Sequence, residues 1–198
     1  TKADTSKKWY SYENKKWANS VILKDESVVY KNGETIPDSN IESYFVWIPK
    51  YSYQLFDLGN YSSLTSISDK TQEIKIKFGT SNTSDSKSGE CATPFSNNQG
   101  IAASSGNCKV GDYMTHPAFL AFDTLGLWVG KFETGYDGAT STASAQVNSV
   151  DTSKIIIKPN VYSWRSITVG NAFKNSYDYK RDLDSHMMKN TEWGSVAY

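Results

Sequence analysis

Alternating apolar and polar residues predict several short strands in the first half of the chain. Residues 72–78, "QEIKIKF", place an apolar side chain at every second position with lysine between, as in a strand with one buried face. Residues 43–56 are rich in aromatic and β-branched side chains and give the strongest strand prediction; Pro49 there marks an edge or a bulge, because proline has no N–H to donate. The apolar run from Val21 to Leu23 follows a polar turn and predicts the second strand of a hairpin.

A further strand pair is predicted around Asn32 and Gly33. This dipeptide favours the type I′ turn, whose twist matches that of antiparallel strands. We therefore expect residues 27–37 to form two short strands joined by that turn.

The second half of the chain combines strands with two short helices. Residues 126–138 and 155–164 have strand patterns interrupted by glycine or proline. Residues 166–175 carry apolar positions at helical spacing, with Ser166 as the expected N-cap.

A last helix is expected within residues 189–198. Asn190 or Thr191 would cap it, and Glu192 lies in the first turn, where the helix dipole favours a negative charge. The spacing i, i+3, i+4 predicts a buried face made of Trp193, Val196 and Ala197.

Two long polar stretches separate these elements. Residues 79–111 and 139–153 are rich in serine, threonine and asparagine and are expected to be surface excursions. Such loops carry function when a fixed framework positions them, so a ligand is expected at one of them. For residues 79–111, a binding loop and a solvated insertion without function are both open.

The only two cysteines, Cys91 and Cys108, lie within the first polar stretch. A disulfide between them would stabilise the fold by about 3 kcal/mol through chain entropy. The alternative is a pair of reduced thiols in a cytosolic loop.

The composition argues against two classes of function, nucleic-acid binding and membrane insertion. Lysine plus arginine equals aspartate plus glutamate at 21 each, so no net field attracts nucleic acid. The sequence contains neither an 18-residue apolar run nor a signal-peptide core, so we expect no membrane insertion of this chain and any signal or anchor outside it. Aromatic residues make up 14% of the chain, which suits a β-rich module located outside the cell or on its surface.

Three stretches, in this order, resemble the formylglycine-generating-enzyme family, also called the sulfatase-modifying-factor domain. They are "GLWVGKFETG" at 126–135, "NVYSWRSITVGNAF" at 160–173 and "HMMKNTEWGSVAY" at 186–198. The resemblance implies an α+β, β-rich variant of the C-type-lectin fold with two short helices and long polar loops. It implies that Trp164 and Trp193 anchor the two helices in the core.

The expected organisation is a single domain over residues 1–198. A β-rich part at 1–78 precedes the polar excursion at 79–111, and residues 112–198 form the part that resembles the family, incomplete at its C-terminus. Trp47 and Trp128 complete the expected core. The same motifs resemble a subset of bacterial surface proteins in which the chain continues further.

From the resemblance, we expect this chain to lack the catalytic activity of the family. The family's catalytic cysteine pair and much of its calcium-binding region lie in the part that this chain lacks, and neither Cys91 nor Cys108 matches a catalytic position. We therefore expect no enzyme and no cofactor; a calcium ion has no support in the residues present, and a formylglycine-generating-type oxidase is the least favoured function.

Candidate sites from the residues themselves are few. Tyr136 and Asp137 are the candidate ligand-binding residues, with a solvated turn as the alternative. A metal site is conceivable at Asp182, Asp184 and His186, although a loop that caps a helix uses the same residues.

His116 and Glu133 have simpler expected roles. His116 precedes a proline in an extended segment and is expected to make a structural hydrogen bond. Glu133 stands in an otherwise apolar strand and is expected to be paired or at the strand end.

Two function classes follow. The first is a non-catalytic extracellular or cell-surface binding or adhesion module whose ligand is a glycan or a protein. The second is a structural subunit of a bacterial surface or phage appendage, which assembles with its own copies or with a second chain that completes the fold.

Overall fold

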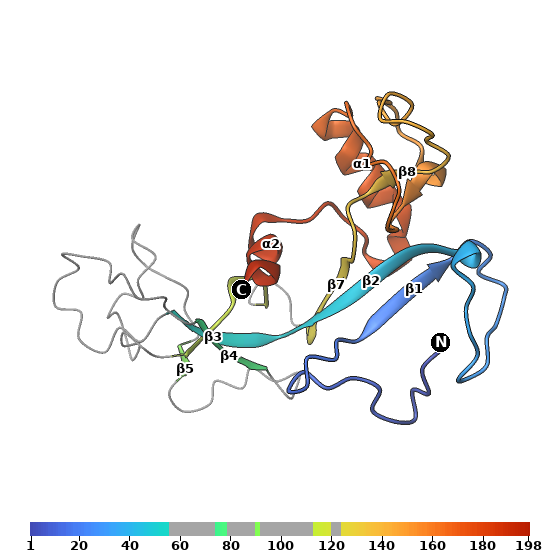
Figure 1. Ribbon diagram of the computed structural model, residues 1–198. Coiled ribbons are helices and arrows are strands. Elements are labelled where there is room, and N and C mark those ends of the chain that lie inside the picture. The colour runs from blue at the N-terminus through green and yellow to red at the C-terminus, as the bar shows by residue number, and fades with distance from the viewer. Residues whose placement is uncertain (56–73, 79–89, 92–112, 120–123) are drawn as a thin grey trace, which may run out of the picture. The chain divides into compact units, whose positions relative to one another are not determined.

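The computed structural model describes residues 1–55, 74–78, 90–91, 113–119 and 124–198 (Figure 1). These residues form small, mainly antiparallel sheets and two α-helices, so the predicted mixed α+β class is confirmed at this level. The chain divides into two compact units. Unit 1 comprises residues 1–47 and 128–188, and unit 2 comprises residues 48–127 and 189–198.

A three-stranded sheet organises unit 1. Its strands are β1 (Asn19–Leu23), β2 (Ile41–Pro49) and β7 (Gly126–Gly130), in the order β1-β2-β7. β1 and β2 are antiparallel, with Val21 opposite Tyr44. The strand predictions for the apolar run at 21–23 and for residues 43–49 are confirmed, and Pro49 is the last residue of its strand. The run at 21–23 is not the second strand of a hairpin, because β1 pairs with the later strand β2 and the residues before β1 form only one isolated bridge.

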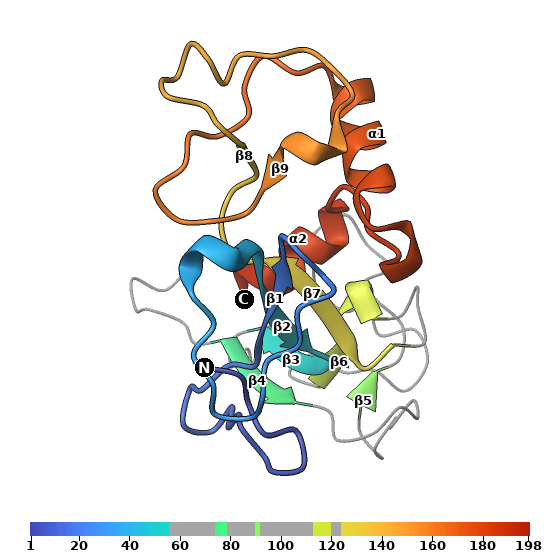
Figure 2. The same cartoon turned by 90° about the vertical axis from the view of Figure 1, so that its right-hand side faces the viewer.

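A second layer of unit 1 is built from short elements. β8 (Gly135–Tyr136) pairs with β9 (Ile155–Ile156), and α1 (Val169–Tyr179) lies beside this pair in both views (Figures 1 and 2). Gly135 allows the close packing, since a Cβ there would lie 2.6 Å from Cγ2 of Val161. Unit 1 also contains three 3-10 helices: η1 (Asp38–Asn40), η3 (Thr152–Lys154) and η4 (Arg181–Leu183).

A buried chain of hydrogen bonds holds α1 against β2. The Ile157 N–H donates to Oγ of Ser43 at 3.2 Å, and this oxygen lies 2.8 Å from the hydroxyl of Tyr179. Tyr179 in turn donates to a carboxylate oxygen of Glu42. Because the Ser43 oxygen accepts from Ile157 and Tyr179 donates to Glu42, the Ser43 hydroxyl donates to Tyr179. Burial, followed by the bond to Glu42, raises the pKa of Tyr179.

Most residues of the polar stretch at 139–153 are exposed, as predicted for a surface excursion, although parts of the stretch are held against α1. Ala145 is fully buried. The amide of Asn175, on the inner face of α1, accepts from the N–H of Asp151 at 2.8 Å and donates to the carbonyl of Ser149 at 2.9 Å. A buried side-chain amide can satisfy a loop's backbone groups in place of water, so Asn175 fixes residues 149–151 of this stretch against the helix.

Helix α1 is confirmed, but its cap and its buried face differ from the prediction. Thr168, not Ser166, caps it by accepting from the N–H of Asn171, while Ser166 lies in the left-handed region at φ 56°. Phe173, one of the apolar residues within 166–175, is 52% exposed. The buried polar contacts of Asn175 and Tyr179 therefore decide which face of α1 points inward.

The strand pair predicted around the Asn-Gly dipeptide does not form. The chain turns there, with a 3.0 Å bond from the N–H of Glu34 to the carbonyl of Lys31, but the described residues 27–37 contain no strand. Of the two turn residues only Gly33 has positive φ, at 82°, so the turn is not type I′.

Unit 2 contains a four-stranded sheet. Its strands are β3 (Tyr51–Leu55), β4 (Ile74–Phe78), β5 (Glu90–Cys91) and β6 (Tyr113–Thr115), in the order β4-β3-β6-β5. The predicted alternation is confirmed over the described residues 74–78, because the isoleucines of β4 pack against the core while its lysines are exposed. That core consists of Tyr51, Tyr53 and Phe119, the last in the 3-10 helix η2 (Pro117–Phe119).

Helix α2 (Asn190–Ala197) is confirmed as an element, but its predicted orientation is wrong. The buried residues are Glu192 and Ser195, whereas Trp193 is 62% exposed and Val196 and Ala197 are exposed too. The hydroxyl of Tyr51 donates to the carbonyl of Ser195 at 2.9 Å, and this bond turns the polar side of the helix inward.

The N-terminus of α2 is capped one residue earlier than expected. The N–H of Lys189 donates to Oε2 of Glu192 at 2.7 Å, so Lys189 is the N-cap and neither Asn190 nor Thr191 has that role. A glutamate at the third helical position that reaches back to the cap N–H is half of a capping box.

The four tryptophans expected in the core have different environments. Trp164 is half-buried, and its indole N–H donates to the carbonyl of Val147 at 2.6 Å. Trp47 is half-buried against Trp128, with ring centroids 5.1 Å apart, but Trp128 itself is 48% exposed. The prediction of a core role is therefore wrong for Trp128 and Trp193.

His116 makes the structural hydrogen bond that the sequence predicts. Its Nδ1 accepts from the N–H of Ala118 at 3.3 Å, and its ring lies 5.5 and 5.4 Å from the rings of Tyr51 and Tyr53. A Cβ at Gly194 of α2 would stand 3.5 Å from the imidazole. Burial among these groups lowers the pKa of His116 to about 4.

This low pKa predicts a loss of stability in mild acid. In the unfolded chain a histidine titrates near 6.5, so between pH 6.5 and about 4 the unfolded state binds the proton and the folded state does not. The free energy of unfolding should fall by about 3 kcal/mol over that range. Denaturant unfolding at several pH values measures the fall, and His116→Gln should flatten it. A folded-state pKa near 6.5 in an NMR titration would contradict the prediction.

Candidate ligand-binding surface

The N-terminal segment of unit 1 carries a row of four aromatic side chains: Trp9, Tyr10, Tyr12 and Trp17, here called the aromatic row. Successive ring centroids lie 5.3, 5.1 and 5.5 Å apart. Trp9 is 42% and Trp17 40% exposed, so both ends of the row are open to solvent. Large apolar side chains gathered on a surface are typical of binding sites.

A tight turn creates this row. Ser11 and Lys16 pair through two backbone hydrogen bonds of 2.9 and 2.8 Å, and Lys15 adopts the left-handed conformation at φ 54°. The turn brings Trp17 back beside Tyr12. Tyr10 and Tyr12 lie on the same side of the extended backbone because they are two residues apart.

Lysines surround the aromatic row. The ammonium of Lys8 lies 5.7 Å from the centre of the Tyr10 ring, a cation–π contact. Lys15 and Lys16 are exposed in the turn, together with the acidic Glu13. Within a protein whose net charge is zero, this turn is therefore locally positive.

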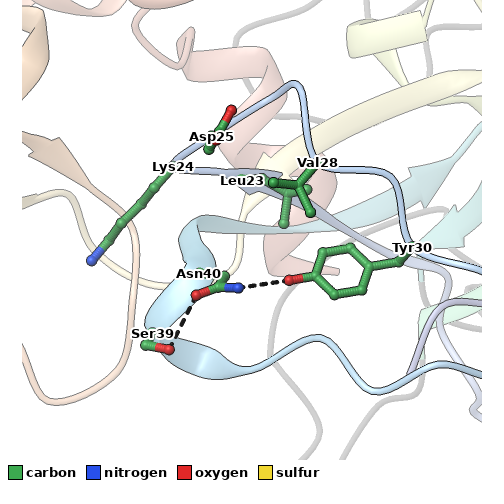
Figure 3. Close-up of a pocket in the computed structure, with 7 residues that line it drawn as sticks. All are labelled: Leu23, Lys24, Asp25, Val28, Tyr30, Ser39 and Asn40. Carbon is green, nitrogen blue, oxygen red and sulfur yellow. Dashed lines mark hydrogen bonds between the residues drawn. The ribbon is translucent and has the colours of Figure 1, made fainter.

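A pocket of about 250 Å³ lies in the same unit, at the far end of β1 (Figure 3). It forms because the N–H of Lys24 donates to the carbonyl of Asn40 at 3.0 Å, which joins the end of β1 to η1. The pocket is lined by Leu23, Lys24, Asp25, Val28, Tyr30, Ser39 and Asn40.

The polar wall of this pocket is held by side-chain hydrogen bonds. The amide nitrogen of Asn40 donates to the hydroxyl oxygen of Tyr30 at 2.7 Å, and the Ser39 hydroxyl donates to the amide oxygen of Asn40 at 3.2 Å (Figure 3). The Tyr30 ring is 9% exposed and so fixed in place.

Helix α1 exposes an apolar stripe. Val169, Phe173 and Tyr177, four residues apart, are 75%, 52% and 46% exposed. The Phe173 and Tyr177 rings stack at 6.0 Å and 5°, and the Arg181 guanidinium lies 4.7 Å from the centre of the Tyr177 ring. A helix on a protein surface normally turns such residues inward.

The two predicted ligand-binding residues lie at the end of β8: Tyr136 is its last residue, and Asp137 begins the turn that follows. The Tyr136 ring packs edge-on against Trp164 at 5.0 Å, and the Lys154 ammonium lies 5.8 Å from its centre. The side chain of Asp137 is exposed, and its backbone N–H donates to the carbonyl of Lys154. Neither residue lines the pocket or belongs to the aromatic row, so their role in binding stays a prediction.

The residues considered for a metal site are spread along the segment that follows α1. Asp182 lies in η4, and Asp184 ends it in the left-handed conformation at φ 55°. Nδ1 of His186 lies 2.7 Å from the carbonyl oxygen of Asp184. Among the residues that the structure describes, no group of three histidine, cysteine, aspartate or glutamate side chains is arranged to hold a metal ion.

The predicted pair of Cys91 and Cys108 lies outside the described residues, apart from the backbone of Cys91 in β5, as does most of the polar stretch at 79–111. Glu133 accepts from the hydroxyl of Ser163 at 2.6 Å, so it is paired as expected. No helix in the described part of the chain has both the length and the apolar character that crossing a membrane requires.

Sequence reasoning missed both the aromatic row and the pocket. The density of aromatic residues at 9–17 was a usable signal for the row, because four of nine positions carry a ring. The pocket left no such signal, since residues 23–30 and 39–40 meet through hydrogen bonds that form only in the folded chain.

No family model matches the sequence, and neither a curated protein nor a solved structure is significantly similar to the chain.

Proposed function

We propose that this chain is a non-catalytic binding module that acts outside the cell or on its surface and holds a carbohydrate chain on the aromatic row. The observation that carries the proposal is the row itself, with adjacent rings 5.1 to 5.5 Å apart and an exposed tryptophan at each end. The abundance of serine, threonine and asparagine supports the location.

Aromatic rings suit carbohydrates for a physical reason. The face of an aromatic ring is the negative part of its quadrupole. The C–H bonds on the face of a sugar ring are weakly positive and apolar, so they stack on such a surface while the sugar hydroxyls stay in water. Tryptophan gives the largest contact area for this purpose and is enriched among residues that dominate binding energy.

The lysines around the row favour a carbohydrate that carries carboxylate or sulfate groups. Lys8, Lys15 and Lys16 are exposed near the rings, against one acidic residue, Glu13. Opposite charge raises the association rate and the affinity, and salt screens both effects.

The proposed fold is a degenerate form of the formylglycine-generating-enzyme type. The three stretches that carry the resemblance contain β7, the start of α1 and the whole of α2, and the two helices match the two short helices that this fold implies. The exposed side chain of Trp193 lies outside the packing that this fold implies.

The aromatic row predicts a specific effect of one substitution. Trp9→Ala should weaken binding of an oligogalacturonate hexamer about tenfold or more, because it removes a stacking surface with little burial in the fold. Isothermal titration calorimetry measures the change. Trp193→Ala is the matched control, since Trp193 is also exposed but belongs to α2, and it should leave the affinity unchanged.

Three results would contradict this function. They are equal affinity of the wild type and Trp9→Ala, tighter binding of a neutral maltohexaose than of the acidic hexamer, and preferential binding of a single-stranded oligonucleotide.

The apolar stripe of α1 supports a second candidate, a structural subunit that assembles with its own copies or with a second chain. Burying Val169, Phe173 and Tyr177 against another molecule would remove exposed apolar area from water, which favours association.

Self-assembly predicts that the molar mass rises with protein concentration. Light scattering after size exclusion should show this rise for the wild type and its loss for Phe173→Ser, because a serine removes the ring at the centre of the stripe. Lys174→Ser, an exposed substitution on the same helix, should assemble as the wild type does. A wild-type mass equal to 22.1 kDa at all concentrations would exclude self-assembly.

A further inference from the structure

We infer that the pocket at the end of β1 binds one neutral sugar ring. This site is separate from the aromatic row and uses different residues: Leu23, Val28 and Tyr30 on its apolar side, Ser39 and Asn40 on its polar side. It does not depend on carbohydrate binding by the row.

The apolar side of the pocket matches the face of a sugar ring. Leu23 and Val28 stand over the pocket on one side, and the Tyr30 ring forms its wall (Figure 3). Small-ligand sites combine such apolar walls with a few polar groups that fix orientation.

The polar side offers both donors and acceptors. The hydroxyl of Tyr30 accepts from Asn40, so its own hydrogen takes no part in that bond. Asn40 uses one of its two N–H hydrogens on Tyr30, and the Ser39 oxygen, which donates its hydrogen to Asn40, keeps its lone pairs. A sugar hydroxyl both donates and accepts, so it can pair with both kinds of group, whereas a ligand that only donates or only accepts leaves one kind unpaired.

The charges at the rim favour a neutral ligand. In Figure 3 the Lys24 ammonium and the Asp25 carboxylate both point away from the Tyr30 ring. Oδ1 of Asp25 already accepts from the N–H and hydroxyl of Ser27, at 3.0 and 2.6 Å. The wall formed by Tyr30 and Asn40 therefore presents hydroxyl and amide groups without a charge.

The size of the pocket selects a single ring. Its volume of about 250 Å³ equals the share of roughly eight water molecules in the liquid, and it is smaller than the sites of drug-sized ligands, which begin near 300 Å³. One monosaccharide fits this space, whereas two linked rings would extend beyond it.

NMR titration of the full chain tests the site. Glucose, galactose and N-acetylglucosamine serve as probes, and glycine serves as a zwitterionic comparison. At least one sugar should shift the side-chain amide resonances of Asn40 in a saturable way, and glycine should not. Val28→Phe, which fills the pocket, should weaken this binding about tenfold or more by steric clash.

Val29→Phe is the matched control. Val29 is 84% exposed, lies next to Val28 and does not line the pocket, so its variant should bind the sugar as the wild type does. The inference is overturned if no sugar shifts Asn40, if glycine binds in preference, or if Val28→Phe binds as tightly as the wild type. Binding at the aromatic row is followed separately at the Trp9 indole, so failure at one site is distinguishable from failure at the other.

Discussion

The buried hydrogen-bond chain from Ile157 through Ser43 and Tyr179 to Glu42 is the interaction on which unit 1 depends. It joins β2 to two segments that lie more than a hundred residues later in the chain, and Ser43 at its centre is fully buried. A buried polar group that loses its partner costs about 1 to 3 kcal/mol, so each member of the chain stabilises the others' positions. The amide of Asn175, one turn earlier on α1, adds the loop at 149–151 to the same arrangement.

This chain of hydrogen bonds also determines which side chains of unit 1 are exposed to solvent. Because Tyr179 and Asn175 turn the polar side of α1 inward, the stripe of Val169, Phe173 and Tyr177 is left outside. Helix α2 of unit 2 likewise turns polar residues inward and an apolar residue outward, with Glu192 and Ser195 buried and Trp193 exposed. Both helices therefore carry apolar surface that their own units do not cover.

Local sequence patterns predicted where strands and helices lie, but they did not predict which face of each helix is buried. The strand at 74–78 followed from the alternation of isoleucine and lysine, and both helices followed from their spacing, because these signals lie within a few residues. The face of α2 depends on Tyr51, 144 residues away from Ser195, and no local pattern contains that contact. The pocket could not be predicted for the same reason, since Lys24 and Asn40 meet only in the folded chain. The cluster of aromatic residues at 9–17 could be read from the sequence, but their arrangement as an exposed row could not.

Carbohydrate binding on the aromatic row is tested most directly by the indole N–H resonances of the six tryptophans, followed while an acidic oligosaccharide is added. The resonances of Trp9 and Trp17 should shift in a saturable way. That of Trp164, whose N–H is bonded to the carbonyl of Val147, should stay unchanged. Shifts confined to Trp128 or Trp193, or no shift at any of the six, would contradict binding at the row.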